Sequence, residues 1–315
     1  MQAATAFAAD VIGRTAWLVN LALPLLGIKR FFGEPEKMPE RIAKLRRQKP
    51  IRPRAKWHRQ FTIRENADRG FALVTIEPPG GHRPGAPHLL YLHGGGYVMD
   101  SAAVYWDAVS DLCERLGASA SVPLYPLAPE NKAADTLAQM RALYLDLATL
   151  HGAPNITVMG DSAGGGMSLA LAQMLKAEGA PLPGSLVLYS PWLDATATAE
   201  GQRAIERRDR MLAVAGLEAC GEMYRGDLPV DDPRVSPLFG PLEDLPPMAI
   251  FSGTSDILLV DGRRLAEKLD RPGMPAHIYR EYQDMFHVWM LLPLPEAQRA
   301  RSETVDFIRQ HRISE

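Results

Sequence analysis

One stretch constrains the fold more than any other part of this chain. An apolar, β-branched run at 156–159 meets two glycines that flank a serine and then continues into an Ala/Leu/Met-rich segment. Gly160, Ser162 and Gly164 form the pattern G-x-S-x-G at a predicted strand-to-helix junction, the context in which this pattern indicates a nucleophile elbow. The turn is tight, so a side chain on either glycine would collide with the neighbouring strand or helix. Such a turn exposes the hydroxyl, and the following helix directs backbone N–H groups at developing negative charge. The same pattern also arises by chance in structural turns, so other parts of the chain must support it.

Composition places the chain among globular proteins with a sizeable core. Hydrophobic residues make up 46% and charged residues 23% of its 315 positions, as in ordinary globular domains. A formal charge of −2 gives no reason to expect a nucleic-acid partner or a strong attraction to anionic membranes. Cys113 and Cys220 lie far apart in helix-like segments, so we expect reduced packing residues. The sequence has no H-E-x-x-H or C-x-x-C pattern, and we expect neither a metal nor a cofactor.

Strands and helices alternate from Trp57 onward. The strands are expected at 58–64, 71–77, 88–92, 118–124, 156–159, 185–190, 248–253 and 277–282, and the helices at 105–116, 131–151, 167–172, 260–269 and 296–312. This order predicts a mostly parallel sheet with helices on both faces. We therefore predict an α/β catalytic domain over residues 56–315.

Two segments fall outside the alternation. Residues 194–245 are too long for a plain crossover and carry a helical piece at 211–224, which predicts an inserted cap. Residues 1–55 are expected to form N-terminal cap helices and a basic linker. Together the two segments can cover the carboxyl ends of the strands, where ligands bind in open α/β sheets.

The N-terminal segment is apolar between Ala16 and Ile28. Asn20 and Pro24 interrupt it, it is too short to span a bilayer, and Asp10 stands where a signal peptide carries positive charge. We expect this segment to pack on the body of a cytoplasmic protein. The alternative is a helix that rests on a membrane surface.

A serine nucleophile needs a base, an acid that orients the base and an oxyanion hole. Beyond Ser162, His287 lies in the loop after the last predicted strand, at the sheet edge that carries the serine. Asp256 lies in the first loop after the preceding strand, and we take it as the acid. Asp261, at the start of the next helix, and Asp284, close to the histidine, are the alternatives.

A second glycine run is expected to form the oxyanion hole. His93, Gly94, Gly95 and Gly96 follow the predicted strand 88–92, and glycine lets a loop approach the substrate closely. The residue after the nucleophile supplies a further N–H group. The candidates are therefore Gly94, Gly95, Gly96 and Ala163.

Large apolar residues flank these motifs and are candidates for an acyl or alcohol pocket, although such residues are more often ordinary core. They are Tyr97, Trp192, Met211, Met285, Phe286, Val288 and Trp289.

Taken together, the motifs resemble those of the hormone-sensitive-lipase family of α/β-hydrolases, the branch rich in bacterial esterases. The matching segments cover the chain from about Trp57 onward: His93-Gly94-Gly95-Gly96-Tyr97, Tyr125-Pro126-Leu127-Ala128-Pro129-Glu130, Gly160-Asp161-Ser162-Ala163-Gly164-Gly165, Ser190-Pro191-Trp192-Leu193-Asp194 and Ser236-Pro237-Leu238. The resemblance implies the α/β-hydrolase fold, a two-part cap and the Ser-Asp-His triad named above.

The resemblance also implies roles within the glycine loop. In this family the second and third glycines line the oxyanion hole, which here are Gly95 and Gly96. His93 is then structural and holds the loop through a hydrogen bond. The family usually has an arginine where this chain has Pro126, so the resemblance does not carry over the loop contact which that arginine makes.

These features predict a serine carboxylic-ester hydrolase that works through an acyl-enzyme. A limited cap favours a small-molecule substrate, either a short- to medium-chain ester or a compact cyclic one. A lactone hydrolase, an amidase or peptidase on the same fold, and a non-catalytic ligand receptor are the alternatives. The presence of Ser162, Asp256 and His287 argues against the receptor. Whether the chain forms a homodimer is left open by the sequence.

Overall fold

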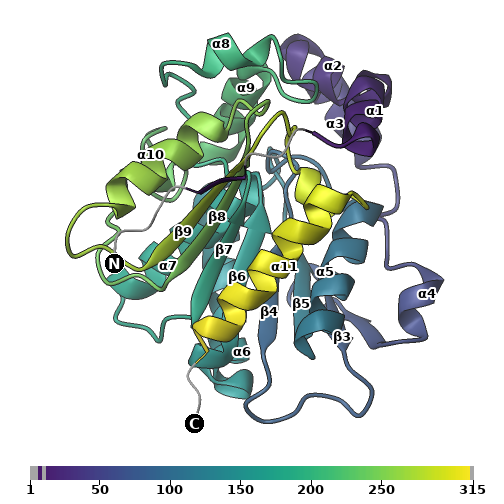
Figure 1. Cartoon of the computed structure of the whole chain (residues 1–315), viewed down its shortest axis with the longest axis vertical. Coiled ribbons are helices and arrows are strands. Elements are labelled where there is room, and N and C mark those ends of the chain that lie inside the picture. Colours follow the sequence, from purple (N-terminus) through teal and green to yellow (C-terminus); the bar gives the residue numbers. More distant parts are fainter. Residues whose placement is uncertain (1–5, 9–11, 313–315) are drawn as a thin grey trace.

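The computed structural model describes residues 6–8 and 12–312, and it shows a twisted sheet between two helical layers (Figure 1). In this part of the chain nine strands follow the spatial order β1-β9-β8-β7-β6-β4-β5-β3-β2. Their bounds are β1 Ala6–Ala8, β2 Thr62–Asn66, β3 Ala72–Glu77, β4 His88–Leu92, β5 Ser119–Leu124, β6 Ile156–Asp161, β7 Ser185–Tyr189, β8 Met248–Gly253 and β9 His277–Tyr282. β3 runs antiparallel to β2 and β5, and the other pairs are parallel. The predicted α/β-hydrolase fold is confirmed.

Helices cover both faces of the sheet and the edge above it. The α-helices are α1 Arg14–Ala22, α2 Ile28–Gly33, α3 Met38–Leu45, α4 Ala55–His58, α5 Ala103–Leu116, α6 Ala133–His151, α7 Ala163–Ala177, α8 Gln202–Glu206, α9 Val214–Arg225, α10 Leu259–Leu269 and α11 Pro295–Gln310. The 3₁₀ turns are η1 Leu23–Leu26, η2 Pro35–Lys37, η3 Ala153–Asn155, η4 Pro237–Phe239 and η5 Trp289–Leu291.

Alternate residues of the buried strands supply two separate cores. In β4, Leu89 packs into the core shared with α5 and α11, whereas Leu90 packs into the core shared with α6, α7 and α10. All five residues of this strand are buried, as expected for a parallel strand covered on both faces. The predicted packing role of the cysteines is confirmed, because Cys113 and Cys220 are both free and buried.

The serine turn leaves no room for side chains at its glycines. A Cβ on Gly164 would lie 1.9 Å from the carbonyl oxygen of Leu92, and one on Gly160 would lie 2.4 Å from that same oxygen. A Cβ on Gly166 would lie 2.2 Å from the carbonyl oxygen of Trp192. Only glycine therefore lets β4, β6 and the start of α7 approach this closely.

The N-terminal helices and the segment that carries α8 and α9 lie together at one end of the sheet (Figure 1). Gly216 of α9 packs on α2, where an added Cβ would lie 2.3 Å from the carbonyl oxygen of Phe32. Lys29 donates hydrogen bonds to the carbonyl oxygens of Glu206 and Leu212. These contacts join the two segments into one covering layer.

The apolar N-terminal segment forms α1 and η1. It packs through Ala16 and Leu23, which are buried, but its outer side exposes several large apolar side chains. The prediction that this segment packs on the body of the protein therefore holds for one of its sides only. No helix within the described residues is long and apolar enough to cross a bilayer.

Substitution of Gly164 by alanine tests the crowding at the serine turn. The added methyl group meets backbone atoms that cannot move away alone, so we expect Gly164→Ala to lower the free energy of unfolding by about 3 kcal/mol or more. Gly33→Ala is the matched control, because nothing lies within 4 Å of a Cβ at that position. The control should be neutral or stabilising by up to about 1 kcal/mol. Equal midpoints of denaturant unfolding for both variants would contradict the crowding argument.

Candidate active site

Ser162 stands at the end of β6 in a strained backbone conformation. Its φ is 52° and its ψ is −121°, a region that residues with a Cβ seldom occupy. Its N–H donates to the carbonyl oxygen of Tyr189 at 2.8 Å, while its own carbonyl oxygen accepts from the N–H groups of Trp192 at 2.9 Å and Gly166 at 3.1 Å. Hydrogen bonds on both sides of the serine thus hold the strained turn.

His287 and Asp256 form a buried hydrogen-bonded pair. Nδ1 of His287 lies 2.8 Å from Oδ2 of Asp256, and the second carboxylate oxygen accepts from the N–H of Leu258 at 2.9 Å. The aspartate is fully buried and the histidine is 4% exposed. A histidine that donates through Nδ1 keeps Nε2 as the nitrogen that can accept a proton.

The loops that carry the triad candidates hold one another in place. Ser255 donates its N–H to the carbonyl oxygen of Met285 at 2.9 Å, and an added Cβ on Gly253 would lie 2.3 Å from that oxygen. Val288 donates its N–H to Oγ of Ser190 at 3.3 Å. The loops after β7, β8 and β9 therefore form one packed unit at the edge where β6 ends.

The electrostatic surroundings of His287 favour its protonated form. Burial by itself lowers the pKa of the imidazole, because the charged ring loses hydration. The carboxylates of Asp256, Asp209 and Asp161 act in the opposite direction and prevail, so the pKa of His287 is raised above its ordinary value. The charge that develops on the ring during proton transfer is therefore stabilised.

Asp209 is a second buried carboxylate at the triad that the sequence analysis missed. Its Oδ1 accepts the N–H groups of Met211 at 2.7 Å and Leu212 at 2.8 Å, and its Oδ2 accepts the N–H of Ile257 at 2.9 Å. Burial and the nearby Asp256 raise its pKa to about 6. Asp209 thus ties the segment between α8 and α9 to the loop that carries Asp256.

One of the predicted oxyanion donors, the N–H group of Gly94, is hydrogen-bonded to Asp161 instead. The Gly94 N–H donates to Oδ1 of Asp161 at 3.0 Å, and the hydroxyl of Tyr91 donates to the same oxygen at 2.6 Å. Burial raises the pKa of Asp161 to about 6, although both hydrogen bonds act against this rise. Gly94 is therefore a structural link between the two glycine turns, and its N–H is not free to bind an oxyanion.

The other oxyanion candidates keep their N–H groups unengaged by the described chain. Gly95 and Gly96 have positive φ values of 110° and 61°, and Ala163 begins α7 next to the serine. As the resemblance implied, His93 holds the loop, because its Nδ1 donates to the carbonyl oxygen of Gly94 at 2.8 Å. These three N–H groups remain the candidates for the oxyanion hole.

Arg46 makes a contact between two loops that Pro126, which replaces the family's arginine, does not make. Its guanidinium donates to the carbonyl oxygens of Val98 and Ala128, both at 2.7 Å, and pairs with Glu130 at 3.1 Å. An arginine from the end of the N-terminal cap therefore clamps the glycine loop to the loop after β5.

Most of the predicted pocket residues are core residues instead. Tyr97 stacks on Tyr224 with ring centroids 3.6 Å apart and lies 5.5 Å from Trp192. Trp289 packs on Tyr282 at 4.2 Å. Five of the seven candidates are buried members of the two hydrophobic cores, namely Tyr97, Trp192, Met285, Phe286 and Trp289. Met211 and Val288 are half-buried, so these two have the most side-chain surface left for a ligand.

The rival acids have other partners. Asp261 is fully buried and accepts the N–H groups of Leu193 at 2.9 Å and Asp194 at 3.1 Å. Asp284 donates its own N–H to Oγ1 of Thr254 at 2.7 Å. Neither makes the hydrogen bond to His287 that Asp256 makes.

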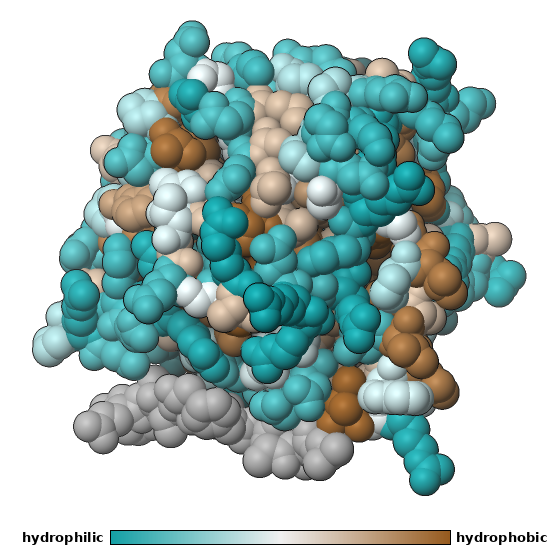
Figure 2. Space-filling view, turned by 90° about the horizontal axis from the view of Figure 1, so that it is seen from above, coloured by the Kyte–Doolittle hydropathy of each residue, from teal (hydrophilic) through white to brown (hydrophobic). Residues whose placement is uncertain are grey.

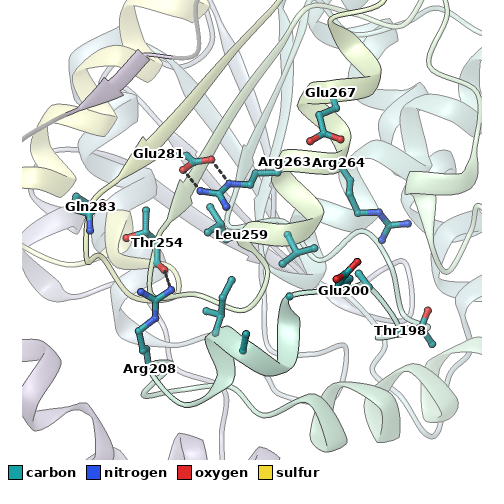
Figure 3. A pocket seen from close by; sticks show the side chains of 15 residues that line it. Thr198, Glu200, Arg208, Thr254, Leu259, Arg263, Arg264, Glu267, Glu281 and Gln283 are labelled. Carbon is teal, nitrogen blue, oxygen red and sulfur yellow. Dashed lines mark hydrogen bonds and ion pairs between the residues drawn. The ribbon is translucent and has the colours of Figure 1, made fainter.

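A cavity of about 980 Å³ opens between α8 and α10 (Figure 3). Arg263 pairs with the buried Glu281 at 2.7 Å, and Arg208 points to the carbonyl oxygen of Thr254 at 3.5 Å. Neither Ser162 nor His287 lines this cavity. The three triad candidates are therefore not among the residues that line this cavity. The described residues contain no group of three or more side chains suited to a metal ion.

Replacement of Asp209 by asparagine tests its effect on the histidine. Loss of this negative charge lowers the pKa of His287, so the acid limb of the kcat/KM profile should move to lower pH. Asp261→Asn is the matched control, because it also neutralises a buried carboxylate that accepts backbone N–H groups. Each variant should lose about 1–3 kcal/mol of stability, but the control should leave the acid limb in place. An unchanged profile in Asp209→Asn would show that this carboxylate does not act on the histidine.

Comparison with known proteins agrees with the fold described above. Residues 89–291 match the family described as alpha/beta hydrolase fold. The chain is 32% identical over 233 residues to a triacylglycerol lipase of Mycobacterium tuberculosis, with 73% of this chain and 48% of the lipase covered. It is 32% identical over 227 residues to an esterase of Acinetobacter venetianus, with 70% and 73% covered. The chain thus spans about half the length of the mycobacterial lipase.

Solved structures show the same arrangement. An esterase/lipase from an uncultured bacterium superposes with a TM-score of 0.81 at 27% identity, covering 95% of this chain and 99% of the other. A hormone-sensitive lipase from a metagenome library gives a TM-score of 0.79 at 26% identity, with the same coverage of both chains.

Proposed function

Because this chain belongs to the hormone-sensitive-lipase branch of the α/β-hydrolase family, a branch of esterases and lipases, we propose that Ser162, His287 and Asp256 carry out its ester hydrolysis. The observation that supports this most directly is the buried 2.8 Å hydrogen bond between the histidine and the aspartate. It orients an imidazole at the sheet edge where the strained serine ends β6. A buried histidine whose pKa nearby carboxylates raise is typical of a catalytic base.

The chemistry follows from these positions. Nε2 of His287 takes the proton of Ser162 as the serine Oγ bonds to the ester carbonyl carbon, and the π electrons move to the carbonyl oxygen. The N–H groups of Gly95, Gly96 and Ala163 stabilise that oxygen. When the intermediate collapses, the bond to the alcohol oxygen breaks, and the histidine returns its proton to the alcohol.

Water then completes the cycle. The histidine takes a proton from water as the water oxygen attacks the acyl carbon, and the serine leaves with that proton. Throughout, Asp256 holds the tautomer that keeps Nε2 free and stabilises the imidazolium.

We also propose that the substrates are short- to medium-chain or compact cyclic esters. This is supported by the stack of Tyr97, which follows the glycine loop, on Tyr224 of α9, because two aromatic rings there leave less room for a long acyl chain. Only Met211 and Val288 among the apolar candidates keep partial exposure. A relative named acetyl-hydrolase, from Streptomyces hygroscopicus and 33% identical over 225 residues, supports a small acyl group.

Hydrolysis of p-nitrophenyl esters from acetate to palmitate tests the proposal. Ser162→Ala should lose more than about 10³-fold in kcat, because the nucleophile is gone. Ser168→Ala is the matched control, since that hydroxyl is buried and bonds to the carbonyl oxygen of Gly164 within α7. The control should retain its activity. Equal slow rates in wild type and Ser162→Ala would contradict the triad and restore the receptor interpretation.

Chain length and leaving group test the substrate class separately. The account predicts that kcat/KM falls from butyrate toward palmitate and that an anilide of the same acyl group reacts more slowly than the ester. A rate that rises steadily with chain length would overturn the proposed size limit. Faster cleavage of the anilide would make the chain an amidase.

A further inference from the structure

The N-terminal cap carries an apolar ridge on its outer side. The ridge consists of Trp17, Leu18, Leu21, Leu25 and Leu26, whose exposed fractions are 54%, 58%, 58%, 89% and 66%. Only three other large hydrophobic residues are comparably exposed in the described chain, and they lie apart from the ridge. Isolated exposed apolar residues are normal, but a contiguous cluster indicates an interaction surface.

The geometry of the segment explains the cluster. Trp17, Leu18 and Leu21 share one face of α1, and η1 continues that face directly. The opposite side packs on the protein through Ala16 and Leu23. Figure 2 shows a hydrophobic cluster bordered by hydrophilic residues on the side where α1 lies in Figure 1. The helix therefore presents apolar side chains both inward and outward.

Positive charge accompanies the ridge. Residues 14–59 contain thirteen Lys or Arg and only three Glu, although the whole chain has a formal charge of −2. Lys44, Arg47 and Lys49 are exposed and form no ion pair with another described residue. The N-terminal cap and linker are thus strongly basic, while the remaining chain is acidic.

A groove of about 310 Å³ begins where the ridge ends. Arg30, Arg41 and Lys44 line it over an apolar floor that includes Phe31 and Leu45. Glu34 engages the two arginines, and the lysine is left for another anion. The cationic groove suits the phosphate of a lipid headgroup, and the apolar ridge beside it suits the acyl chains of that lipid.

We propose that this face docks on an anionic lipid surface, with the ridge at the acyl-chain boundary and the basic residues at the headgroups. Exposed Trp and Leu next to Lys and Arg are the features of interfacial helices, and clustered cations favour anionic leaflets. A second copy of this chain fits the face less well. A twofold contact places the same patch on both sides and would bring two strongly basic segments together.

Cosedimentation with vesicles tests the proposal on the full chain. The protein should bind vesicles of phosphatidylcholine plus phosphatidylglycerol more tightly than vesicles of phosphatidylcholine alone, and added salt should weaken the difference. The double variant Leu21→Ser/Leu25→Ser should reduce binding by at least about tenfold. Leu150→Ser on α6 is the matched control, because that leucine is 65% exposed and far from the ridge in the chain. It should bind like wild type.

Lys44→Glu/Arg47→Glu separates the basic contribution from the apolar one. This variant should lose the preference for phosphatidylglycerol, whereas the leucine variant should lose binding to both kinds of vesicle. The two leucine variants and the Lys44→Glu/Arg47→Glu variant should hydrolyse soluble p-nitrophenyl acetate as wild type does, which shows that they are folded. Ser162→Ala should bind vesicles normally, so the docking proposal stands or falls separately from the catalytic one.

Two results would overturn the proposal. One is equal vesicle binding by wild type and the leucine variant. The other is a dimer in analytical ultracentrifugation that the leucine substitutions dissociate without any effect on vesicle binding, which would assign the ridge to a second copy.

Discussion

The site depends on the close approach of three backbone segments. The carbonyl oxygen of Leu92, at the end of β4, lies where a Cβ on Gly160 or Gly164 would stand. This contact sets the separation of the two glycine turns, and the carboxylate of Asp161 then links them by accepting the N–H of Gly94. Nucleophile and oxyanion candidates thus share one rigid support, as precise positioning of charge stabilisation requires.

Three carboxylates determine the electrostatic surroundings of His287 at this site. Asp256, Asp209 and Asp161 all raise the pKa of His287, which opposes the effect of burial. Asp209 comes from the segment between α8 and α9 and accepts the N–H of Ile257, the residue after Asp256. The cap therefore covers His287 and also raises its pKa. A substitution of Asp209 in the cap changes the pKa of this histidine as well.

Sequence patterns predicted the elements whose signal is local. The strand 88–92 matches residue for residue, because a buried strand bounded by Pro and Gly has a clear pattern. The three-residue strand Ala6–Ala8 has too little length to show a period. Gly94 was correctly placed in the glycine loop, but only the folded chain shows that Asp161 accepts the hydrogen bond from the Gly94 N–H group. Asp209 lies in an irregular segment, and only tertiary packing brings it to the triad.

The central claim is that Ser162 is a nucleophile activated by His287. Treatment of the full chain with a fluorophosphonate, followed by peptide mass spectrometry, tests this most directly, because the reagent reacts with activated serines. The account predicts one adduct, on Ser162, that forms far more slowly in His287→Ala. An adduct on another serine, or none at all, would contradict it.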